Sequence, residues 1–227
     1  MLKELIWNKY GILFRKGTFD EYIIDEVLNQ AIYDGYKDVI KPKTIIDLGA
    51  HIGCFTLKSA YDNPKAKIWS YEITDNNFNI LQLNVERNGL TGRCKLYEFG
   101  VSKYSGLRVV SATGINTGSA TIRECLDGKT DVPTMTVVAT IDLESIYNMT
   151  GYKEIDLVKC DIERAELEVF PSVPRSVISR VKCYIMELHF NGTEEDTNEY
   201  AKLITRFNES GFNCNRIGNT YLFVREK

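Results

Sequence analysis

Short apolar runs alternate with longer amphipathic segments along the chain from Thr44 onward. Strands that are buried on both faces read as continuous apolar runs, and helices between such strands place them parallel in one sheet. The first run, Thr44-Ile45-Ile46-Asp47-Leu48, follows Pro42 and ends at Gly49, and a helix should follow over 53–61. The pattern therefore predicts an α/β fold around a mostly parallel sheet.

The domain organisation follows from the same pattern, which we interpret as a single domain over 1–227. Residues 43–227 should form the core, and a turn-rich segment near 102–121 should be a loop or hairpin insertion. Residues 1–42 should form an N-terminal helical cover, led by Tyr22, Ile23, Val27 and Leu28. The further strands are predicted at 67–71, 94–99, 155–160 and 181–188, with a terminal antiparallel pair at 212–216 and 221–225.

Composition narrows the class of protein. A chain of 227 residues with 44% hydrophobic content can bury one full core, and its net charge of -3 lacks the excess of Lys and Arg that binds phosphate backbones. Residues 1–20 have no continuous apolar region, and no later run approaches the ~18 apolar residues of a membrane span. The six cysteines include no CxxC pair, so no zinc site is expected. We expect a cytoplasmic monomer or homodimer that binds neither nucleic acid nor membrane.

A glycine turn directly after the first strand carries the strongest ligand-binding signal. Asp47, Gly49 and Gly53 form a DxGxxxG pattern, in which glycine lets the backbone turn sharply and approach a ligand. The dinucleotide pattern GxGxxG is absent, because His51 stands where its second glycine would be. Glu72 ends the next strand, where a carboxylate can accept hydrogen bonds from ribose hydroxyls. An adenosine cofactor without a pyrophosphate satisfies both observations, although a turn without a ligand and a solvated strand end stay open.

With these residues the chain resembles the FkbM-type family of class I S-adenosylmethionine-dependent methyltransferases, over about residues 10–224. The most specific parts are residues 46–56, residues 72–84 around Glu72 and Asn77-Phe78, and residues 156–166. The resemblance implies a Rossmann-like, twisted, seven-stranded sheet with helices on both faces, and S-adenosylmethionine as the cofactor. It also implies that Asp47, Gly49 and Ala50 surround the methionine portion of the cofactor, that Glu72 binds the ribose and that Asn77 steadies the loop after it. With His51 and Gly53 of the glycine turn, these are the predicted cofactor-binding residues.

Two residues depart from the family pattern. His51 replaces the Asn that is usual in the first loop, and Arg164 replaces the Gly that is usual in the Asp-x-Glu-Gly-Ala-Glu stretch. Arg164 could bind an anionic group of the methyl acceptor, or it could pair with Glu168 one helical turn later.

Candidate catalytic residues follow the fourth and fifth predicted strands. Asp161 and Glu163 come after the fourth strand, and Glu187 and His189 share one face of the fifth. Carboxylates and an imidazole at a strand-end cleft could deprotonate a hydroxyl or hold a divalent cation. The alternatives are a helix N-cap for Asp161, a helix-dipole partner for Glu163, a strand residue paired with a cation for Glu187 and a surface loop residue for His189. We predict His189 as the general base, with Asp161 and Glu163 orienting the acceptor or a bound cation, and assign no residue as a metal ligand.

The function that follows is methyl transfer to an oxygen of a small-molecule or sugar acceptor. Three other classes stay open. A nucleotide-dependent oxidoreductase would need a phosphate-binding glycine turn, and an RNA or protein methyltransferase would need an extended basic or peptide-binding surface. A non-catalytic nucleotide-binding module would need an acceptor site spoiled by Arg164 and His51.

Overall fold

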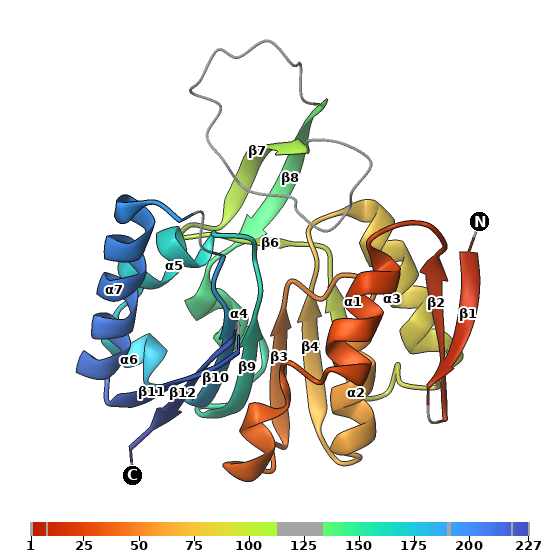
Figure 1. Cartoon of the computed structure of the whole chain (residues 1–227), viewed down its shortest axis with the longest axis horizontal. Coiled ribbons are helices and arrows are strands. Elements are labelled where there is room, and N and C mark those ends of the chain that lie inside the picture. Colours follow the sequence, from red (N-terminus) through yellow and green to blue (C-terminus); the bar gives the residue numbers. More distant parts are fainter. Residues whose placement is uncertain (1, 8, 113–133, 190–191, 219, 227) are drawn as a thin grey trace.

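The computed structural model describes residues 2–7, 9–112, 134–189, 192–218 and 220–226 (Figure 1). Its central sheet contains seven strands, which are β3 (Thr44–Leu48), β4 (Lys67–Tyr71), β5 (Cys94–Tyr97), β9 (Ile155–Cys160), β10 (Val181–Glu187), β11 (Phe212–Ile217) and β12 (Thr220–Arg225). The order is β11-β12-β10-β9-β3-β4-β5, with β12 antiparallel to both β10 and β11 and the other pairs parallel. The predicted fold class, including the terminal antiparallel pair, is confirmed.

Helices cover both faces of this sheet because the side chains of each buried strand alternate between the two faces. Ile45 packs in one hydrophobic cluster, whereas Ile46 and Leu48 pack in the other. One face carries α2 (Cys54–Asp62) and α3 (Asp75–Arg87), and the opposite face carries α4 (Leu143–Met149), α5 (Glu166–Ser172), α6 (Arg175–Ile178) and α7 (Glu194–Glu209) (Figure 1). Burial on both faces explains the uninterrupted apolar runs in the sequence.

The prediction of a helical cover over residues 1–42 is wrong for its first part. Leu2–Trp7 (β1) and Tyr10–Arg15 (β2) pair as an antiparallel hairpin against α3. Tyr10 and Ile12 are buried with period two, and the backbone N–H groups of Gly11 and Leu13 donate to the side-chain amides of Asn88, the C-cap of α3, and Asn84. These side-chain acceptors satisfy backbone N–H groups of β2, which is not part of the central sheet.

The second part of this segment is helical, as predicted. It contains α1 (Asp20–Ile24), a π-helical turn η1 (Asp25–Asn29) and a 3-10 turn η2 (Asp34–Asp38). Tyr22, Ile23, Val27 and Leu28 lie in α1 and η1. The chain changes from strand to helix between β2 and α1, where buried and more exposed residues stop alternating.

The predicted insertion contains a hairpin. Gly106–Ala112 (β7) pairs antiparallel with Thr134–Ile141 (β8), and Gly100–Val101 (β6) pairs parallel with β8. The hairpin projects beyond the central sheet (Figure 1). Residues 113–121 of the predicted insertion lie outside the described residues. The assignment of the whole chain to a single domain stays a prediction.

None of the helices in the described part of the chain combines the length and the apolar character of a membrane span. The predicted cytoplasmic location stays a prediction.

We expect Gly49→Ala to destabilise the fold more than Gly89→Ala. Both glycines have positive φ, +77° and +66°, so each substitution should cost about 1–2 kcal/mol in backbone strain. A Cβ on Gly49 would lie 1.7 Å from the carbonyl oxygen of Asp161, whereas a Cβ on Gly89 would meet no atom within 4 Å. Overpacking should therefore add about 1–3 kcal/mol at Gly49 alone. Urea unfolding of the two variants would measure the difference, and equal losses would contradict the close approach.

Candidate active site

A cavity of ≈ 350 Å³ opens beyond the carboxyl ends of the parallel strands, where open α/β sheets bind their ligands. The loop after β3 contributes Gly49, Ala50 and His51, and the loop after β4 contributes Glu72. One side is a set of residues that we call the N-terminal wall, which contains Phe19, Tyr22, Ile23, Val27 and Tyr33. The far side is a set that we call the acidic end, which contains Asp161, Glu163, Glu187 and His189. Both histidines of the chain line this cavity.

The loop after β3 turns tightly through three residues with positive φ. These are Gly49 (+77°), His51 (+52°) and Gly53 (+94°). The backbone N–H groups of Gly49 and Ala50 both donate to the carbonyl oxygen of Tyr71, which fixes the loop to the end of β4. Histidine and asparagine tolerate this left-handed region better than most residues do, so His51 can take the position where the family pattern has Asn.

Glu72 is a buried carboxylate with a fixed orientation. Its Oε2 accepts the backbone N–H of His51 at 2.9 Å. Its Oε1 accepts the N–H and the hydroxyl of Thr74 at 3.0 and 2.8 Å, and the side-chain amide of Asn77 at 3.3 Å. A carboxylate oxygen can accept more than one hydrogen bond, so Oε2 keeps the capacity to accept a ligand hydroxyl.

Asp47 and Gly53 lie outside the cavity lining, although the other five predicted cofactor-binding residues are part of it. Asp47 is fully buried, and its Oδ2 accepts the hydroxyl of Thr56 at 2.7 Å. Gly53 packs against α3, since a Cβ there would lie 2.6 Å from Leu81 Cδ1. Both residues therefore stabilise the loop after β3 from outside the cavity.

The three predicted catalytic residues meet at the acidic end. His189 Nε2 lies 3.7 Å from Asp161 Oδ1, 3.8 Å from Glu163 Oε2 and 4.0 Å from Glu187 Oε1. Burial alone would lower the pKa of His189, but the surrounding carboxylates, Asp161 first, raise it above its usual value. Burial raises the pKa of Glu163 to about 7, partly offset by the positive charge of His189. At these distances the protonation of one group depends on the protonation of the others.

Lys159 and Tyr33 complete the acidic end, and our sequence analysis assigned a role to neither. The Lys159 ammonium is buried, donates to the carbonyl oxygen of Gly49 at 2.7 Å and lies 3.4 Å from Asp161 Oδ2. Burial would lower the pKa of Lys159, but Asp161 and Asp47 raise it, so the lysine stays charged. A lysine inside an apolar strand was the signal that could have identified it, because Lys is almost never fully buried without a partner.

The Tyr33 hydroxyl donates to Glu187 Oε2 at 2.6 Å and lies 3.0 Å from Asp161 Oδ2. Burial, with the negative charge of Asp161 next, raises the pKa of Tyr33 well above its usual value, so the hydroxyl keeps its proton as a donor. The local sequence around Tyr33 contains no signal for this role, since its partners lie more than 120 positions away.

Comparison with known proteins decides the family. The model of the methyltransferase FkbM domain matches residues 47–214, which is more than half of the chain. This chain belongs to the FkbM methyltransferases. It is a methyltransferase, and its family and fold imply S-adenosylmethionine as the methyl donor.

Two relatives and one solved structure show the range of similarity. The AMB antimetabolite synthetase AmbE of Pseudomonas aeruginosa is 24% identical over 200 residues, which cover 74% of this FkbM methyltransferase but only 9% of AmbE. The methyltransferase sdnD of Sordaria araneosa is 23% identical over 195 residues, which cover 74% of each chain. A structure from Clostridium thermocellum, described as a candidate rRNA methylase, has a TM-score of 0.53 at 10% identity and covers 88% of this chain and 96% of its own. This structural likeness shows the fold alone.

Neither of our two expectations for Arg164 in this FkbM methyltransferase is correct. Its guanidinium pairs with Asp196 of α7 and donates to the backbone carbonyl of His189 at 2.8 Å, outside the cavity lining. Glu168 contacts Arg108 instead. Arg164 has a φ of +74°, which explains why the family favours Gly here. The contact with His189 offsets this strain and holds the backbone of the acidic end.

The ligand atoms of Asp161, Glu187 and His189 all lie within 4.8 Å of one another, close enough to share a divalent cation. The Lys159 ammonium beside Asp161 already supplies positive charge there, and Tyr33 already donates to Glu187. Asp161, Glu187 and His189 are therefore suited to proton transfer without a bound cation.

We expect Glu166→Gln to stabilise the protein at high pH and not at low pH. Glu166 is fully buried behind His189, and its Oε2 has no hydrogen-bond partner in the described structure. Burial raises the pKa of Glu166 from 4.5 to about 7. The stability that its protonated form contributes is present below pH ~4.5 and is lost as the pH rises through ~7. The neutral amide avoids this loss.

Unfolding by urea at about pH 4.5 and pH 8 would test this expectation. The variant should gain about 2–3 kcal/mol relative to the parent at the higher pH. Glu199→Gln on the exposed side of α7 serves as the control and should show no such gain. The same difference at both pH values would contradict the assigned protonation of Glu166.

Proposed function

We propose that this methyltransferase transfers a methyl group from S-adenosylmethionine to a hydroxyl of a neutral small-molecule or sugar acceptor. The observation that carries the proposal is that one cavity joins the loop after β3 and Glu72 to the acidic end. A methyl donor bound at the loop after β3 and Glu72 would face a base at the acidic end.

The residues fit the cofactor. Gly49 lines the cavity, so its backbone can approach a ligand closely, and a side chain at this position would collide with Asp161. Glu72 would accept the ribose hydroxyls, with Asn77 fixing its carboxylate, and Ala50 and His51 would lie along the methionine portion. The carboxylates of the acidic end suit the positive sulfonium and ammonium groups of this cofactor. When bound, it supplies an electrophilic methyl group.

The acidic end also favours one class of acceptor. Asp161, Glu163 and Glu187 line the cavity together with Glu26, and the ammonium of Lys159 is already paired with Asp161 and Asp47. Arg164, the cation that could have bound an anionic acceptor, is held by Asp196. This excess of carboxylates over cations repels anions, so a neutral hydroxyl compound fits better than a phosphate or carboxylate.

His189 would remove the acceptor proton, since a hydroxyl is a poor nucleophile until it is deprotonated. The neighbouring carboxylates of Asp161 and Glu163 would stabilise the imidazolium that forms. The N-terminal wall would exclude water and hold the acceptor in line with the methyl group, and such positioning supplies much of the rate. The acidic lining also disfavours an RNA substrate, because RNA phosphates would meet like charge.

We expect S-adenosylhomocysteine to bind the parent protein and Glu72→Ala to weaken that binding. Loss of a charged acceptor for two hydroxyls should cost about 1.5–3 kcal/mol, or roughly 10- to 100-fold in Kd. Isothermal titration would measure both affinities, with circular dichroism confirming that the variant is folded. An unchanged Kd in the folded variant would remove Glu72 from the ribose site.

We expect His189→Ala to lower the methyl-transfer rate by roughly 10²- to 10⁴-fold with little change in S-adenosylhomocysteine affinity. The parent rate should rise with pH and level off above the raised pKa of His189, because the base must be deprotonated. Glu163→Gln removes one of the charges that raise this pKa, so its inflection should move to lower pH. Initial rates between about pH 6 and pH 9 would measure both effects. Near-parental turnover by His189→Ala would exclude it as the base, and loss of parental activity with a chelator would indicate a cation instead.

A further inference from the structure

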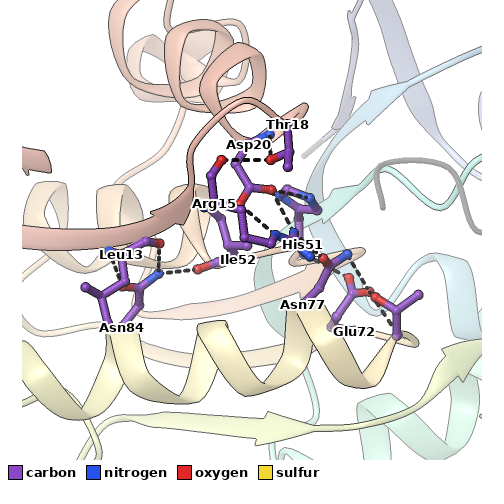
Figure 2. Close-up of polar contacts among 10 residues, drawn as sticks. Leu13, Arg15, Thr18, Asp20, His51, Ile52, Glu72, Asn77 and Asn84 are labelled. Carbon is purple, nitrogen blue, oxygen red and sulfur yellow. Dashed lines mark hydrogen bonds and ion pairs between the residues drawn. The ribbon is translucent and has the colours of Figure 1, made fainter. Parts of the chain in front are cut away.

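The N-terminal wall comes from a part of the chain that the family model does not include. That model begins at residue 47, whereas the wall lies in residues 19–33. Figure 2 shows how Arg15 and Asp20 connect the N-terminal part of the chain to the loops after β3 and β4. Neither residue lines the cavity. The two residues form the centre of a polar network that ends on Glu72 and His51.

Arg15 binds two partners with one guanidinium. Its Nε donates to Asp20 Oδ2 at 2.9 Å, and its terminal nitrogen donates to Asp20 Oδ1 at 2.7 Å. The same terminal nitrogen donates to Asn77 Oδ1 at 2.7 Å. This fork therefore links the end of β2 and the start of α1 to the first turn of α3.

The contact with Arg15 fixes which way the Asn77 amide points. With Oδ1 accepting from a guanidinium, Nδ2 must face the other side, where it donates to Glu72 Oε1 at 3.3 Å. Oε1 is then occupied by Asn77 and Thr74, so the Glu72 carboxylate turns Oε2 toward His51 and the cavity. Arg15 thus sets the orientation of Glu72 through one intervening residue.

Asp20 forms the second branch of the network. Its carboxylate is fully buried and also accepts the backbone N–H of Arg15 at 2.7 Å. Its Oδ1 lies 3.5 Å from Nε2 of His51, whose ring nitrogens are buried and have no hydrogen-bond partner among the described residues. Asp20 therefore places a negative charge beside the imidazole at the turn of the loop.

We propose that Arg15 and Asp20 are positioning residues for the cofactor, which orient Glu72 through Asn77 and place His51 at the turn of the loop. This inference rests on the proposed binding of S-adenosylmethionine at Glu72. The same contacts dock the N-terminal wall, so cofactor binding and closure of the wall stabilise each other.

Arg15→Lys tests the role of the fork. Lysine keeps a positive charge beside Asp20 but cannot donate to Asp20 and Asn77 with the planar geometry of a guanidinium. The Kd of S-adenosylhomocysteine and the KM of S-adenosylmethionine should each rise about tenfold, while the KM of the acceptor, which depends only on docking of the N-terminal wall, rises less. A purely structural role would lower the melting temperature without separating the two KM values.

Arg87→Lys is the matched control. Arg87 also joins the N-terminal hairpin to α3, through an exposed ion pair with Glu4, but has no contact with Glu72. Its substitution should leave the Kd of S-adenosylhomocysteine unchanged. Equal weakening in the two variants would overturn the proposal, because any loosening of the hairpin would then suffice.

Hydrogen exchange of the parent protein gives a second readout that does not depend on a folded variant. S-adenosylhomocysteine should slow exchange of the backbone amides over residues 15–29 more than those of β1. Protection absent from 15–29 despite measurable binding would overturn the positioning role and leave the proposed function intact. If the parent failed to bind S-adenosylhomocysteine, the proposed function would fail as well.

Discussion

The site depends on the buried ammonium of Lys159. Its Nζ lies within 3.5 Å of Asp47 and Asp161 and donates to the carbonyl oxygen of Gly49, so one charge joins β3, β9 and the loop between the sheet and α2. Two carboxylates buried this closely would repel each other without a cation between them. A buried charge is stable only when it is paired and hydrogen-bonded, and removal of one partner typically costs about 3–5 kcal/mol. The approach of Gly49 to Asp161 completes the arrangement, because it leaves no room for a side chain.

On the cavity side, this arrangement leaves an excess of negative charge at the acidic end. One lysine offsets only part of the negative charge of Asp161, Glu163, Glu187 and the buried Glu166. The remainder raises the pKa of His189 above its usual value, and burial raises the pKa of Glu163 to about 7. Shifted pKa values of this kind are typical of catalytic sites, which agrees with the proposed role of His189 as the general base.

The N-terminal segment connects the ion pairs of Lys159 and the acidic end to the rest of the molecule. Tyr33 contacts the acidic end, whereas Arg15 and Asp20 act on the other end of the cavity through Asn77 and beside His51. One segment therefore contacts both the proposed base and the proposed ribose site. This segment lies outside residues 47–214, so part of the cavity lining comes from residues that the family model does not match.

The sequence by itself determined the sheet, the loop after its first strand and the candidates at the strand ends. Continuous apolar runs require burial on both faces, and Gly49 and Glu72 follow their strands directly, so local patterns were sufficient. Only the tertiary structure decided that Asp47 stabilises the loop from outside the cavity, that Arg164 binds Asp196, and that Leu2–Trp7 pairs with Tyr10–Arg15. It also decided that Tyr33 donates to Glu187 and that Arg15 orients Asn77. These roles depend on contacts between residues far apart in the chain, and the direction of a buried polar side chain is set by the partners that satisfy it.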